Sequence, residues 1–199
     1  MIKIKETYEN EIVINKSRFI GVLIPIDDES LVKEKIKELT KKYPKATHYC
    51  YAYIISKKEK SNDDGEPSGT AGRPILEVIK NNNLENVLLM VIRYFGGIKL
   101  GAGGLVRAYV NASKDVIDIA DRYQVEKHNI FELKMDYSLY DSVNYYLENQ
   151  NGKIIDTSFD EQIKITYLAK EISQSDLDEI SRGTIKIVSL GEKEVYIRI

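Results

Sequence analysis

The chain has 199 residues, of which 43% are hydrophobic and 30% charged, which is typical of a globular protein and excludes the disordered class. The formal net charge is -2, so the chain lacks the global positive field that draws a histone-like protein to nucleic acid, and any anion site must be local. The longest apolar run, at residues 87–92, is far shorter than the roughly 20 residues that span a bilayer.

The N-terminal segment predicts a cytoplasmic protein. Residues 1–14 alternate apolar and charged side chains and contain neither the apolar core nor the small-residue cleavage site of a signal peptide. We therefore expect no membrane association. The single cysteine, Cys50, cannot form an internal disulfide, and its apolar and aromatic neighbours predict a buried, inert thiol.

The first part of the chain predicts antiparallel strands and one helix. Alternating segments at residues 2–8 and 11–15, and a nearly apolar segment at residues 18–26, indicate strands. Capping residues then introduce a segment with helical spacing that ends at Pro44. Residues 47–55 are rich in β-branched and aromatic side chains, which favours a further strand.

A long polar stretch at residues 56–72 contains Asp-Gly and Glu-Pro breakers and is expected to be an exposed loop. A short helix follows with a proline in its first turn and ends near residues 81–83. The apolar run beginning at residue 86 is typical of a strand buried on both faces. Apolar residues at helical spacing from Leu105 onward predict a long amphipathic helix that ends near Asp121.

A polar stretch at residues 122–129 predicts a linker, which divides the chain into domains 1–128 and 129–199. The second domain shows patterns in the order β-α-β-β-α-β, which is typical of the ferredoxin-like fold. The first domain has no equivalent order, so no internal duplication is expected. His128 lies in the predicted linker, and we assign no role to it.

Five of the 12 glycines fall within residues 96–104, and residues 86–114 contain no Asp or Glu. One explanation is chemical: glycines allow close approach of a ligand, and the following helix presents free N–H groups to an anion. The alternative is close packing of strand and helix, which also excludes charge. The spacing matches neither the Walker nor the dinucleotide pattern. The candidate residues for binding an anion or nucleic acid are Arg18, Arg73, Arg93, Gly96, Gly97, Lys99, Gly101, Gly103, Gly104 and Arg107.

A second candidate is the carboxylate cluster of Asp63, Asp64 and Glu66, which could bind a divalent cation or a basic partner, or simply form a solvent-facing turn. His48, on a predicted strand, is a candidate catalytic acid or base and equally a candidate structural histidine. The sequence has no pair of histidines at metal-ligand spacing, and we predict no metal site.

These motifs resemble the IMPACT family, in its bacterial YigZ-like branch, over essentially the whole chain. The resemblance rests on SRF at residues 17–19, His48 with residues 52–53, NDDGEP at 62–67, GTAGRP at 69–74, RYFGG at 93–97, and the matching positions 99–101 and 103–109. It implies an α+β protein. The N-terminal domain would resemble the second domain of a small-subunit ribosomal protein, and the C-terminal ferredoxin-like domain the last domain of elongation factor G.

The resemblance also bears on function. Eukaryotic relatives act as translational regulators that bind the ribosome-associated activator of a stress kinase, and they carry a different N-terminal domain for part of that role. The present sequence has the second domain instead, so the kinase-regulating function is not transferred to it.

Three functions follow as hypotheses. The leading one is a translation-associated regulatory module that needs no cofactor and binds RNA, the ribosome or a translation factor through the basic, glycine-rich face. The alternative is an enzyme that acts on a phosphorylated or nucleotide-like small molecule, with Mg²⁺ held by the carboxylate cluster and His48 as acid or base. A third is a protein scaffold that pairs through the ferredoxin-like domain.

Overall fold

The computed structural model describes residues 1–199 and divides the chain into two compact units. Unit 1 comprises Met1–Gln124 with Ile197–Ile199, and unit 2 comprises Val125–Tyr196. The boundary falls within the long strand β7 (Tyr123–Met135), so the polar stretch expected to be a linker is a strand instead. Its backbone is paired with β1 (Ile2–Lys3) at one end and with β9 (Ile163–Ala169) at the other, and its polar side chains do not indicate that pairing.

Unit 1 is built on a five-stranded antiparallel sheet in the order β2-β3-β6-β4-β5. Its central strand is the continuous apolar run of the sequence, and its side chains are buried on both faces, as predicted. The strands are β2 (Tyr8–Ile14), β3 (Ser17–Pro25), β4 (His48–Ile55), β5 (Lys58–Asn62) and β6 (Val87–Tyr94).

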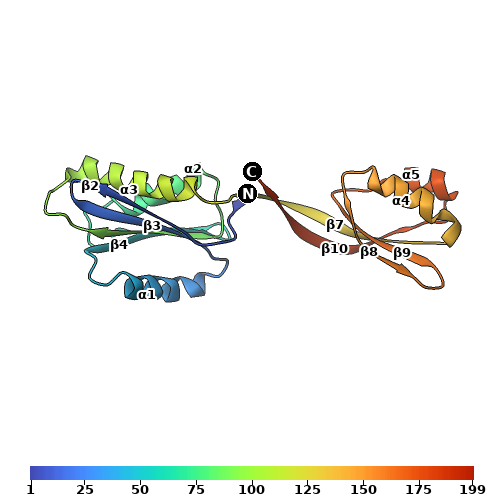
Figure 1. Cartoon of the computed structure of the whole chain (residues 1–199), viewed down its shortest axis with the longest axis horizontal. Coiled ribbons are helices and arrows are strands. Elements are labelled where there is room, and N and C mark those ends of the chain that lie inside the picture. The colour runs from blue at the N-terminus through green and yellow to red at the C-terminus, as the bar shows by residue number, and fades with distance from the viewer. The chain divides into compact units, whose positions relative to one another are not determined.

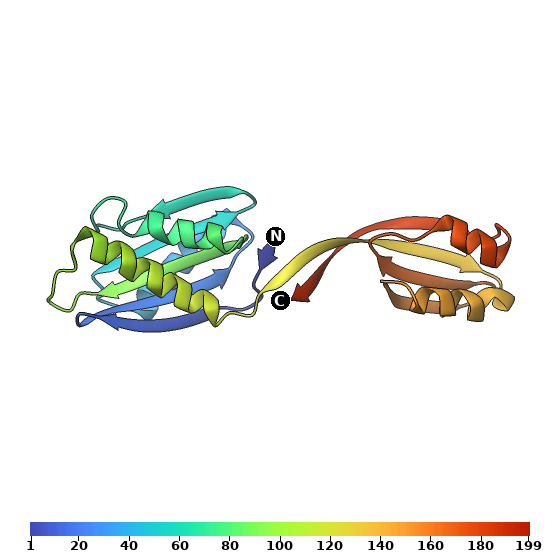
Figure 2. The same ribbon diagram turned by 90° about the horizontal axis from the view of Figure 1, so that it is seen from above.

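Helices cover both faces of this sheet (Figure 1). On one face lie α2 (Gly72–Asn81) and α3 (Gly101–Asp118), and on the other lies α1 (Val32–Lys42), preceded by a short 3-10 turn at Glu29–Leu31. Figure 2 shows α2 and α3 side by side, with both helices beginning toward the same end of the sheet. The positive ends of the two helix dipoles therefore face the same way.

Unit 2 has the predicted order β-α-β-β-α-β. Its strand β7 lies next to both β9 and β10, with β8 beyond β9, which is the ferredoxin-like arrangement. The α+β class and this second fold are thus confirmed. The remaining elements are the 3-10 turn Tyr137–Leu139, α4 (Tyr140–Glu148), β8 (Lys153–Phe159), β9 (Ile163–Ala169), α5 (Gln174–Ser181) and β10 (Ile187–Arg198).

Two details differ from expectation. The predicted exposed loop contains β5, which forms a hairpin with β4 through a two-residue turn at Ser56 and Lys57, both with positive φ. The side chains of β5 are all exposed, so no apolar alternation signals the strand. Helix α3 also begins earlier than expected, at Gly101, so part of the glycine segment is helical. None of the helices combines the length and apolar character needed to cross a bilayer.

The close packing of α3 on β3 depends on Gly21. A Cβ atom at Gly21 would lie 2.6 Å from the carbonyl oxygen of Ala112. We expect Gly21→Ala to lower the free energy of unfolding by about 2 kcal/mol, because the helix must move away from the strand. Gly103→Ala is the control: its Cβ meets only the side-chain end of Arg107 at 3.6 Å, and alanine favours a helix by about 0.5–1 kcal/mol. Urea denaturation measures both, and equal effects would contradict the packing role of Gly21.

Candidate anion-binding site

A pocket of about 440 Å³ lies in unit 1 where β6 ends and α3 begins. It brings together three parts of the sequence that were singled out separately: His48, the carboxylate cluster through Glu66, and the glycine-rich segment. Apolar side chains form much of the remaining wall. The lining residues are Thr47, His48, Glu66, Pro67, Arg93, Phe95, Lys99, Leu100, Gly101, Ala102 and Leu105.

Arg93 is a buried part of this wall, with only 5% of its surface exposed. Its Nη1 donates to Oε1 of Glu66 at 2.5 Å, and its Cζ lies 5.3 Å from the ring centre of Phe19 and 5.4 Å from that of Phe95. Its Nε is enclosed and has no hydrogen-bond partner. Although residues 86–114 contain no acid, Arg93 does not stand unopposed, because the loop that precedes α2 brings Glu66 to it.

Two buried neutral donors bond to the loop that carries Glu66. The hydroxyl of Tyr109 donates to Oε1 of Glu66 at 2.8 Å, and the thiol of Cys50 donates to the carbonyl oxygen of Asp63 at 3.0 Å. Burial raises the pKa of Cys50 to about 12 and raises that of Tyr109 as well. Both groups therefore keep their protons at neutral pH, and Cys50 is a buried, unreactive thiol. No sequence pattern indicates this role of Tyr109, because its position fits the apolar face of the helix.

His48 is held in a defined orientation. Its Nδ1 lies 2.8 Å from the carbonyl oxygen of Asp64. Because a carbonyl oxygen only accepts, Nδ1 carries the proton in this arrangement. The other ring nitrogen, Nε2, lies 3.8 Å from Oε2 of Glu66. In its neutral form His48 thus presents an unprotonated Nε2 beside Glu66, and a proton taken up there would face the carboxylate.

The two helices that begin at this end of the sheet are capped differently. Asp63 accepts hydrogen bonds from the backbone N–H groups of Gly69, Ala71 and Gly72 and so satisfies the start of α2. Helix α3 has no side-chain cap, and its first turn carries no acidic residue. The first N–H groups of an α-helix have no partner within the helix, so this end of α3 offers donors to the pocket.

The carboxylate cluster is occupied by these internal contacts. Asp63 caps α2, Asp64 accepts from the backbone N–H of Tyr49 at 2.6 Å, and Glu66 is paired with Arg93. No group of three or more His, Cys, Asp or Glu side chains is arranged to hold a metal ion. The residues therefore do not fit the Mg²⁺ site considered for the enzyme alternative.

The exposed cations of the glycine-rich face are distributed unevenly. Lys99 lines the pocket, and the guanidinium of Arg107 reaches back toward Gly103 in the first turn of α3. Arg73 is exposed in the first turn of α2. Arg18 is also exposed, but Glu11 binds its guanidinium through two hydrogen bonds of 2.8 Å, which neutralises its charge.

The glycines of the segment have separate structural reasons. A Cβ atom at Gly96 would lie 2.0 Å from the carbonyl carbon of Lys16, so only glycine fits there. Gly97 and Gly101 have φ of 84° and 70°, which side chains rarely adopt. Gly103 and Gly104 lie in the first turn of α3. A Cβ at Gly104 would lie 3.0 Å from that of Leu100, so packing and backbone conformation account for four of the five, and Gly103 leaves the start of the helix uncovered.

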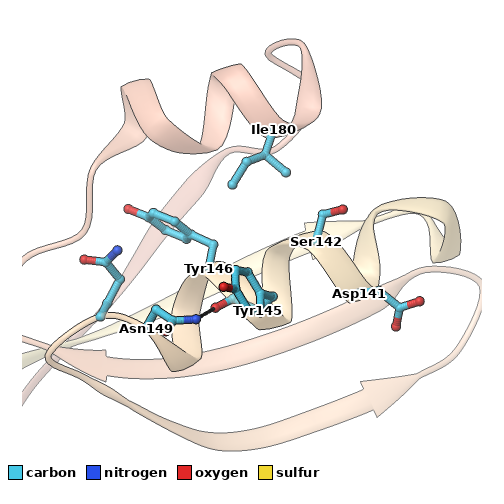
Figure 3. A pocket seen from close by; sticks show the side chains of 7 residues that line it. Asp141, Ser142, Tyr145, Tyr146, Asn149 and Ile180 are labelled. Atoms are coloured by element: carbon cyan, nitrogen blue, oxygen red, sulfur yellow. Dashed lines mark hydrogen bonds between the residues drawn. The ribbon is translucent and has the colours of Figure 1, made fainter.

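A second cavity of about 630 Å³ lies in unit 2 on the exposed side of α4 and α5 (Figure 3). Two of its polar side chains are already bonded: the hydroxyl of Tyr146 donates to Asp176, and the side-chain amide of Asn149 donates to the carbonyl oxygen of Tyr145. No cation or unpaired buried group faces it. The cavity therefore lacks the converging donors of the pocket in unit 1.

Fold and pocket together define a two-domain α+β protein with a candidate anion site in its first domain. Residues 15–117 match the family model described as Impact N-terminal domain, and residues 133–184 match a domain of unknown function (DUF1949). The chain belongs to the IMPACT family.

Individual relatives agree with this assignment. The IMPACT family member YvyE of Bacillus subtilis is 38% identical over 171 residues, which cover 84% of this chain and 79% of that protein. The IMPACT family member YigZ of Escherichia coli is 28% identical over 188 residues, or 90% of this chain and 92% of that protein. A solved structure described as a hypothetical protein covers 96% of this chain and 98% of its own, with 26% identity and a TM-score of 0.60.

The cap of α2 makes a testable contribution to stability. Burial opposes the charge of Asp63, but three backbone hydrogen bonds outweigh it and hold the pKa of that carboxyl below its ordinary value of 3.8. A lowered folded pKa means that the carboxylate stabilises the fold above the unfolded pKa and that this contribution is lost as the pH falls through the folded one.

We expect Asp63→Asn to lower the free energy of unfolding at neutral pH by about 1–2 kcal/mol. The bonds from Ala71 and Gly72 to Oδ1 become neutral, and the bond from Gly69 to Oδ2 is lost because an amide NH2 cannot accept. The difference from the wild type should shrink as the pH falls through the folded pKa of Asp63. Asp28→Asn is the comparison: Asp28 is exposed and accepts one backbone bond, from Ser30, which also lowers its pKa, so the same effect should be present but smaller. Urea denaturation over the acid range measures both, and a gap that stays constant with pH would contradict the role of the charge.

Proposed function

We propose that this chain is a translation-associated regulatory protein that binds RNA through the basic face formed by Arg73, Lys99 and Arg107. Membership of the IMPACT family supports the link to translation, because the resemblance implies that eukaryotic members regulate it. The single observation that carries RNA binding is the exposed start of α3, where Lys99 and Arg107 stand beside a helix end without a cap or an acidic side chain. Such a face suits phosphate groups.

The proposed face is confined to one side of unit 1. Helix α1 lies on the opposite face of the sheet and contains five Lys and two Glu. Lys35 pairs with Glu38 and Lys42 with Glu9, but the helix remains basic, so it is the competing face that a control substitution must test. Arg18 is withdrawn from the proposal because Glu11 already pairs with it. The net charge of -2 means that binding must come from this local arrangement of cations rather than from the protein as a whole.

The test is the salt dependence of binding to a single-stranded RNA, followed by fluorescence anisotropy. Each phosphate neutralised on a single strand contributes about 0.7 to the slope of log affinity against log salt. We expect Arg107→Ala to reduce the slope by about that amount. Lys37→Ala, which removes one exposed charge from α1 on the other face, should leave it unchanged. Equal slopes in all three proteins would remove Arg107 from the contact, and absence of binding at low salt would remove the RNA proposal.

A second candidate function is an enzyme that acts on a phosphorylated small molecule. The observation that favours it is His48, whose Nδ1 is fixed by a backbone carbonyl while Nε2 stands at the pocket beside Glu66. Incubation with phosphate esters, followed by phosphorus NMR, tests it. Conversion that His48→Asn abolishes would support catalysis, and an unchanged spectrum for the wild type would count against it.

A further inference from the structure

We propose that the pocket at the start of α3 is a binding site for a phosphate monoester that carries an apolar or planar body. This inference goes beyond contact with the RNA backbone, because it concerns the recess behind the basic face rather than the exposed cations. It rests on two independent features that meet at one cavity: a helix start without a cap, and a buried guanidinium with an unused donor.

Arg93 supplies the first feature, a guanidinium in the pocket wall that is paired with Glu66 and keeps one unsatisfied donor. Its side chain is only 6% exposed, and of its donors Nη1 is bound to Glu66 while Nε is enclosed without a partner. A buried donor that makes no hydrogen bond is costly, and such a group in a native protein calls for a reason. The rings of Phe19 and Phe95 hold the guanidinium in place, so its direction is set before any ligand arrives.

The start of α3 supplies the second feature, a set of backbone N–H donors. Gly101 and Ala102 line the pocket, and their backbone N–H groups belong to the turn that has no partner within the helix. Lys99 adds a mobile positive charge at the same wall. The backbone donors of the helix and the ammonium of Lys99 thus meet beside the guanidinium of Arg93. The three terminal oxygens and double charge of a phosphate monoester match them better than the two oxygens of a carboxylate.

The other charged groups at the pocket do not cancel this preference. Glu66 is the one carboxylate in the wall, and its Oε1 is already bound to Arg93 and Tyr109. His48 is neutral or positive, so it does not repel an anion. The volume of about 440 Å³ exceeds the room that a phosphate group needs, and Pro67, Phe95, Leu100 and Leu105 offer apolar surface to the rest of the molecule.

Calorimetric titration of the full chain with phenyl phosphate tests the site, with phenol and benzoate as uncharged and carboxylate analogues. We expect phenyl phosphate to bind and phenol not to bind. Ala102→Asp places a fixed carboxylate at the pocket wall and should weaken binding at least about tenfold, while the acid near a helix start leaves the fold intact or more stable. Asn111→Asp adds the same charge to an exposed position farther along α3 and should leave binding unchanged.

Each outcome of these titrations bears on one part of the proposal. Absence of binding by phenyl phosphate, or equal binding by Ala102→Asp and the wild type, would overturn the site, and equal binding of benzoate would overturn the preference for phosphate. The source of the monoester is distinguished by comparing adenosine 5′-monophosphate with a single-stranded RNA that carries either a 5′-phosphate or a 5′-hydroxyl. Binding of the 5′-hydroxyl RNA tests the basic face alone, because that strand has no terminal monoester, so failure of one proposal is not failure of the other.

Discussion

Glu66 and Arg93 form an ion pair at 2.5 Å whose side chains are 4% and 6% exposed. Removing two charges from water costs several kcal/mol per ion, and a buried pair offsets this only when its remaining donors and acceptors are also satisfied. Here the hydroxyl of Tyr109 donates to Glu66 and the rings of Phe19 and Phe95 flank Arg93, but Nε of Arg93 stays without a partner. Loss of either partner would leave the other charge buried alone, at a cost of about 3–5 kcal/mol.

The pair connects every element around the pocket. Arg93 is next to the last residue of β6, Tyr109 lies on α3, and Glu66 belongs to the loop that leads into α2. Once Glu66 fixes this loop over the end of the sheet, Asp63 can cap α2 and the carbonyl of Asp64 can hold His48. The loop therefore turns its carboxylates inward. Its polar sequence is typical of a solvent-facing turn or a cation site, but in the structure its carboxylates bind groups within the same domain.

The fold was predictable where local pattern and burial coincide. The apolar run of β6 reflects a strand buried on both faces, and the helical spacing of α3 reflects one buried helix face. The sequence alone therefore indicates both elements. The strand β5 and the first part of β7 are polar and depend on pairing with distant strands, which no local pattern contains. For the same reason the partner of Arg93 could not be predicted: Glu66 lies 27 positions earlier in the chain and meets it only in the folded structure.

The buried ion pair raises the question of why charged groups line this pocket. Apolar residues of similar size would fill the same space at equal or lower cost, so stability does not require the pair. Two charged groups are an expensive way to close the end of a sheet, and Arg93 keeps an unpaired donor as well. Beside it stands a helix start without the acidic cap that its neighbour α2 receives from Asp63. The pair itself is neutral, so the positive potential at this cavity comes from the uncapped start of α3 and from Lys99, and an anionic ligand would satisfy both.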